Sequence, residues 1–136
     1  IAACVKKRRL TPILAASFGI LFYVLSAAGP GLLSYLMMTK QAGTNWYLAS
    51  VYLYLHFNYN GWFLFGIIAL FINQMEISGI PYNKKLAKTA VIFLAISCIP
   101  AFFLSVLWMQ PNIAIRLTAV GADMLQFTAF ILLIIS

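Results

Sequence analysis

Long apolar runs alternate with short polar segments along this chain of 136 residues. The apolar runs cover residues 10–38, 46–72, 86–109 and 113–136, and the segments between them read TKQAGTN, NQMEISGIPYNKK and QPN. Gly, Pro and Asn in these segments are typical of helix ends and turns. A hydrocarbon core about 30 Å thick requires about 20 apolar residues at a rise of about 1.5 Å each. The pattern therefore predicts an all-α transmembrane helical bundle with four spans.

The composition excludes a soluble domain. Hydrophobic residues make up 64% of the chain, charged residues make up 8%, and the mean hydropathy is +0.98. Soluble domains carry about 25% charged residues. We interpret residues 1–136 as a single transmembrane helical domain. Because the chain opens without Met and closes on FILLIIS without a flanking loop, we expect it to be a piece of a longer protein.

The net charge of +7 comes from basic residues at the ends of the apolar runs. They form no stripe interleaved with aromatic residues, so nucleic-acid binding is not expected. The expected partners are the lipid bilayer and other helices of the parent protein or its subunits. Cytoplasmic loops carry the excess of Lys and Arg. One side holds Lys6, Lys7, Arg8, Arg9, Lys84, Lys85 and Lys88, and the other holds Lys40 and Arg116, which predicts a cytoplasmic N terminus.

Pro30 and Pro100 lie in the interior of predicted spans, and two cysteines lie far apart in the sequence. Pro30, in the AAGPG segment, and Pro100 should each bend their helix, because proline lacks an amide donor and crowds the preceding turn. Cys4 and Cys98 form no disulfide framework and no ligand spacing typical of zinc, so both should be free thiols.

Polar residues in the second span carry the candidate chemistry. At 100° per residue, one face of the predicted helix holds Tyr52, His56, Tyr59, Asn60 and Phe63. The opposite face holds Tyr54, Asn58 and Trp62. Because both faces carry hydrogen-bonding groups that lipid cannot satisfy, we expect neighbouring helices to enclose this span.

His56 is the single histidine of the chain and lies near the midplane of its span, about ten residues from the outer side. An ionisable group at this depth is a functional-site candidate. In one interpretation, a neutral imidazole bonds to Asn60 or to a facing carbonyl and holds helices together. In the others, His56 binds haem or a metal, or transfers protons.

Asp123 lies at a similar depth in the fourth span, which runs parallel to the second. A carboxylate there is costly unless it is paired or protonated. We hypothesise that Asp123 meets His56, directly or through water, in a polar seam between the second and fourth spans. Arg116 is a competing partner, and Gln126 extends the same face. In the alternative, Asp123 lines the wet outer end of its span.

The segment VYLYLHFNYNGWFLFGIIALF, residues 51–71, resembles a family of uncharacterised bacterial multi-pass membrane proteins. The members of that family look like distant relatives of subunit I of haem-copper oxidase and nitric oxide reductase. The YLHFNYNGWF motif carries the resemblance. It implies a bacterial inner (cytoplasmic) membrane protein with a helical core in which His56 is a possible metal ligand.

The chain departs from the haem-copper pattern because it has one histidine and neither an adjacent pair nor an HxH pair. Haem would therefore require ligands from outside this segment. Two functions stay open. One is a redox membrane subunit with His56 as a ligand or in a proton path. The other is a non-enzymatic transporter, assembly component or scaffold, in which these polar residues line a cavity or lock helices.

Overall fold

The computed structural model describes residues 10–136. Within this range, four helical stretches are long and apolar enough to cross a membrane, namely Leu10–Met38, Asn45–Ile77, Lys84–Ser105 and Ile113–Ile134. The same range contains no strand. The predicted all-α bundle of four spans is confirmed. The N-terminal bases Lys6 to Arg9 and Cys4 lie outside the described residues.

The first span consists of two helices, α2 (Leu10–Ser26) and α3 (Ala28–Met38), which meet at Ala27. The amide of Ala27 donates to the carbonyls of Tyr23 and Val24, at 3.3 and 3.2 Å, so the helical pattern is disturbed at this residue. Pro30 follows three residues later and supplies no amide donor to the preceding turn. This break is the one that the AAGPG segment predicts.

The second span is the most irregular. It runs through α4 (Asn45–His56), a π-helical segment η1 (Phe57–Phe63) and α5 (Leu64–Ile77). A π-helix forms i to i+5 hydrogen bonds and is rare except as a short insert, often at functional sites. The span also continues to Ile77, beyond the predicted end at residue 72.

The third and fourth spans begin at asparagine caps. Asn83 accepts hydrogen bonds from two backbone amides at the start of α6 (Lys84–Ser105), and Asn112 accepts one at the start of α7 (Ile113–Ile134). Such caps satisfy amides that have no partner within the helix. Pro100 lies inside α6, which continues to Ser105, and a short 3-10 helix η2 (Leu107–Met109) follows.

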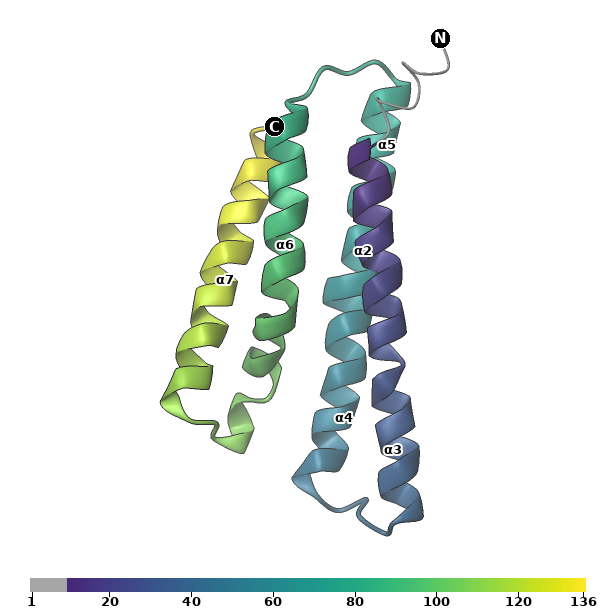
Figure 1. Ribbon diagram of the computed structural model, residues 1–136, viewed down its shortest axis with the longest axis vertical. Coiled ribbons are helices and arrows are strands. Elements are labelled where there is room, and N and C mark those ends of the chain that lie inside the picture. Colours follow the sequence, from purple (N-terminus) through teal and green to yellow (C-terminus); the bar gives the residue numbers. More distant parts are fainter. Residues whose placement is uncertain (1–9) are drawn as a thin grey trace.

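The spans form two antiparallel hairpins (Figure 1). In the first hairpin, residues 10–77, α2 packs on η1 and α5 while α3 packs on α4. In the second hairpin, residues 84–134, α7 packs along α6. The loop between α5 and α6 lies at one end of the bundle, and the other two loops lie at the opposite end. Helix α6 joins the hairpins because it contacts α2, α4 and η1.

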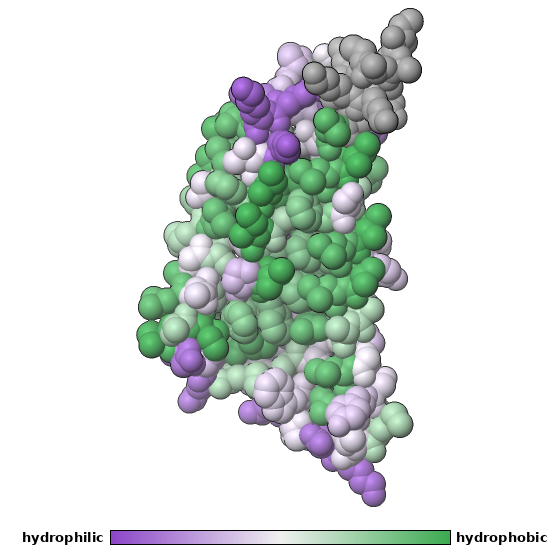
Figure 2. Space-filling view, viewed as in Figure 1, coloured by the Kyte–Doolittle hydropathy of each residue, from purple (hydrophilic) through white to green (hydrophobic). Residues whose placement is uncertain are grey.

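Apolar side chains cover the middle of the bundle, and hydrophilic residues gather at its two ends (Figure 2). This belt matches the hydrocarbon layer, where large exposed apolar surfaces carry no penalty. Helix α7 is the least enclosed span: 17% of its most apolar window is buried, against 44% for α6. Its buried residues are the small Ala119, Ala122 and Ala129, which permit close approach to α6.

Candidate functional site at His56

His56 lies at the junction of the α-helical and π-helical parts of the second span. It is the last residue of α4, and η1 begins at Phe57. Its side chain is buried, with 6% of its surface exposed. The ring faces α6, and Phe57 and Phe102 pack edge-on against it, at centroid distances of 5.2 and 5.8 Å. The imidazole is therefore enclosed between the second and third spans.

Both ring nitrogens of His56 have hydrogen-bonding partners. Nε2 lies 2.9 Å from the carbonyl oxygen of Cys98. Because a carbonyl only accepts, Nε2 carries the proton and donates. In the neutral imidazole Nδ1 then accepts, and it lies 3.3 Å from the amide nitrogen of Asn60 and 3.4 Å from the hydroxyl of Ser105. The arrangement fits one tautomer, a neutral ring with its proton on Nε2.

Cys98 and Asn60 complete a ring of hydrogen bonds with His56. The Cys98 thiol donates to the carbonyl oxygen of Asn60 over 3.8 Å, while its own carbonyl accepts from His56. The Asn60 side chain in turn donates to His56. Cys98 is a free, buried cysteine, as predicted. We call His56, Asn60, Cys98 and Ser105 the His56 cluster.

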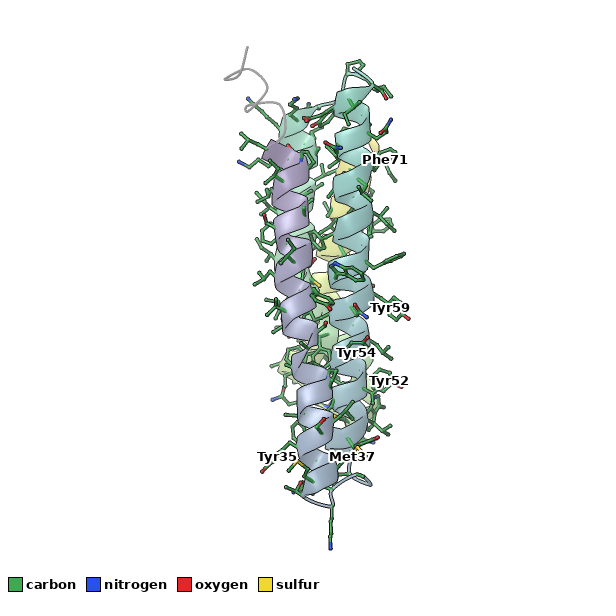
Figure 3. The ribbon with its side chains drawn as sticks, turned by 90° about the vertical axis from the view of Figure 1, so that its right-hand side faces the viewer. Tyr35, Met37, Tyr52, Tyr54, Tyr59 and Phe71 are labelled. Atoms are coloured by element: carbon green, nitrogen blue, oxygen red, sulfur yellow. The ribbon has the colours of Figure 1, made fainter. Side chains whose placement is uncertain are left out.

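The two tyrosines predicted beside His56 are not part of the cluster. Tyr59 has 62% of its surface exposed and points away from the bundle (Figure 3). Tyr52 has 40% exposed, and its ring packs against Trp108 at a centroid distance of 6.1 Å. The polar site is therefore smaller than the predicted helix face, and of that face only Asn60 joins His56.

The predicted pairing of Asp123 with His56 is wrong in this structure. Asp123 is exposed on α7 and, within residues 10–136, makes no hydrogen bond or ion pair. It borders a surface hollow with Gln126 and Phe127. Equal depth did not bring the two residues together because α7 packs along α6 and not against α4. Arg116 forms no ion pair with Asp123 within the described residues, and its Nε donates to the carbonyl of Pro111.

Sequence reasoning offered a facing carbonyl as a partner of His56 but did not identify it as that of Cys98, and it did not consider Ser105. The Cys98 partner is a backbone carbonyl, so no side chain signals it. A hydroxyl seven residues after Cys98 in the same apolar run is a weak signal. Only the packing of α6 against α4 and η1 brings both groups to the ring.

A second polar cluster lies where α5 ends and α6 begins. Glu76 is almost enclosed, with 6% of its side chain exposed, and its Oε1 accepts from the Tyr82 hydroxyl at 2.7 Å and from Lys84 Nζ at 2.9 Å. Burial, together with the hydrogen bond to Glu76 and the charge of that residue, raises the pKa of Tyr82 to about 12, although a hydrogen bond with Thr11 opposes the shift. These contacts explain why the span continues past residue 72.

The His56 cluster does not fit haem or metal ligation as it stands. A ligating imidazole must offer one nitrogen lone pair, and the Nδ1 lone pair faces Asn60 and Ser105 while Nε2 bonds to Cys98. Residues 10–136 contain no group of three His, Cys, Asp or Glu residues placed to hold a metal ion. The chemistry that the cluster does supply is a set of hydrogen bonds between two spans.

Comparisons of this chain with protein-family models, with curated proteins and with solved structures found no match.

Proposed function

We propose that this chain is a non-enzymatic, membrane-embedded scaffold component in which the His56 cluster locks the first hairpin to the second. The supporting observation is that both ring nitrogens are engaged within the protein. A catalytic or ligating histidine requires a nitrogen free for its substrate or metal. The open face of α7 then offers the surface for lipid or for helices of a larger assembly.

The first test removes the imidazole. His56→Leu should lower the free energy of unfolding in detergent by about 1–2 kcal/mol, because polar contacts between membrane helices contribute about 0.6 kcal/mol on average and up to about 1.7. Tyr59→Leu, an exposed change three residues away, should leave stability unchanged. In a double-mutant cycle with Ser105→Ala, the two losses should be smaller than additive.

The interpretation as a redox subunit predicts a different absorbance spectrum for the same samples. A haem-binding subunit would show a Soret band in its reduced-minus-oxidised spectrum, and His56→Leu would abolish that band. We expect no His56-dependent band. Finding one, or finding that His56→Leu and Tyr59→Leu are equally stable, would contradict the scaffold proposal.

We further propose that the protein resides in the bacterial inner membrane with its N terminus in the cytoplasm. The location rests on the resemblance of residues 51–71, and the orientation rests on charge. Lys84, Lys85 and Lys88 lie at the end of the bundle where α6 begins, while Lys40 and Arg116 lie at the other end.

The orientation predicts which end a membrane-impermeant thiol reagent reaches. In intact cells, Lys40→Cys should be labelled, while Lys85→Cys should be labelled only after the membrane is opened. The buried Cys98 can stay in place, and Cys4→Ser removes the other thiol. Labelling of Lys85→Cys alone in intact cells would reverse the orientation. Labelling of both would mean that the two loops share one side.

A further inference from the structure

An apolar pocket opens between the two hairpins, away from the loop that joins them. It has a volume of about 310 Å³ and draws its walls from α3, α4, the end of α6 and the start of α7. Leu32, Leu53, Phe103, Val106 and Ile115 are among its lining residues. Pockets for small molecules start at about 300 Å³.

The walls of the pocket are almost entirely apolar. Ser50 is the one hydroxyl residue of the lining, and its Oγ already donates to the carbonyl of Trp46 at 2.8 Å. A water needs two to four polar partners, so this space does not favour water. Phe102 both lines the pocket and packs against His56, which keeps the pocket apart from the His56 cluster.

The depth of the pocket matches the outer part of the hydrocarbon layer. Trp46 is the second residue of α4, and Leu53 lies seven residues further along the same span, about 10 Å deeper. Met109 and Pro111, in the loop region between α6 and α7, close the end nearest the headgroups. The cavity thus extends inward from the interface, as a lipid chain does.

The cationic side chain of Arg116 lies at the rim of this pocket. Arg116 follows the lining residue Ile115, and its Nε donates to the carbonyl of the lining residue Pro111 at 3.0 Å. Its side chain is exposed and forms no ion pair with any residue of the described range. A guanidinium keeps further N–H donors that match the geometry of a phosphate group.

We propose that this pocket binds one acyl chain of an anionic phospholipid whose phosphate group contacts Arg116. The apolar lining and the depth of the pocket fit the acyl chain, and the charge of Arg116 at the rim, unpaired within the described range, fits the phosphate group. A basic side chain near a membrane surface contributes about 1 kcal/mol of attraction to anionic lipid. The site is independent of the His56 cluster, so its failure would not affect the scaffold proposal.

The test compares two lipids on the full chain in detergent. Binding of phosphatidylglycerol and of phosphatidylcholine is measured by native mass spectrometry during titration. Arg116→Gln should weaken phosphatidylglycerol binding about fivefold, the change that corresponds to about 1 kcal/mol. Lys40→Gln, which removes a charge at the same end of the bundle but away from the pocket lining, should leave this affinity unchanged.

A second variant addresses the acyl chain. Leu32 lines the pocket and is 45% exposed, so Leu32→Trp should fill the mouth without disturbing the core and should weaken binding of both lipids. Leu48→Trp, at a similarly exposed position outside the lining, is the control. Equal binding by Arg116→Gln and wild type, or by Leu32→Trp and Leu48→Trp, would overturn the proposal. So would dimerisation of the chain through this face, or a non-lipid molecule that co-purifies in the pocket.

Discussion

Gly29→Ala should separate the first two spans, whereas Gly31→Ala should leave them together. A Cβ at position 29 would lie 2.7 Å from the Cβ of Tyr54 and 2.8 Å from the carbonyl oxygen of Ser50. A backbone carbonyl cannot move without its helix, so α3 and α4 must shift apart. Overpacking of this kind costs about 1–3 kcal/mol, and we expect the upper part of that range. A Cβ at position 31 meets nothing within 4 Å.

The pair is a matched comparison because both glycines lie in α3, two residues apart, on either side of Pro30. Both substitutions add one methyl group and remove the same backbone freedom, so their difference isolates the contact with α4. Unfolding in detergent, followed by circular dichroism, gives the two stabilities. If the two variants have the same free energy of unfolding, the close approach of α3 and α4 does not hold this end of the hairpin together.

Hydropathy predicted the spans well because the membrane restricts the backbone so strongly. Residues 10–38 match α2 and α3, and the bend near Pro30 follows from the chemistry of proline. The far end of the second span was missed because Asn73, Gln74 and Glu76 are polar and were read as loop. Glu76 remains in the helix because Tyr82 and Lys84 bond to its carboxylate, a tertiary effect that a local pattern does not contain.

The candidate site was predicted only in part. His56 is buried and bonds to Asn60 and to a facing carbonyl. These contacts agree with the interpretation in which a neutral imidazole holds helices together. The predicted pairing of His56 with Asp123 was wrong because equal depth fixes only the position along the membrane normal. It does not determine which helices are neighbours. That choice depends on packing, and here α6 lies between α7 and the first hairpin.

The π-helical segment also changes which aromatic side chains are buried, and this leads to the second large effect. At 100° per residue, Phe63 would share the buried face of His56 and Phe65 would lie opposite. In the structure η1 intervenes, Phe63 is 55% exposed, and Phe65 is fully buried. Its ring packs against those of Phe18 and Phe22 at centroid distances of 5.9 and 5.4 Å.

Phe65→Ala should therefore destabilise the bundle far more than Phe63→Ala. A residual cavity of roughly 100 Å³ at about 24 cal/mol per Å³ corresponds to about 2 kcal/mol. The cavity term dominates because burial between membrane helices involves no transfer from water, and the association depends on packing. Phe63→Ala removes a ring that faces lipid and should change stability by less than about 0.5 kcal/mol. Unfolding in detergent measures both variants. If Phe63→Ala proved less stable than Phe65→Ala, Phe63 would lie on the buried face, as in a regular α-helix. η1 would then not set the packing of this span.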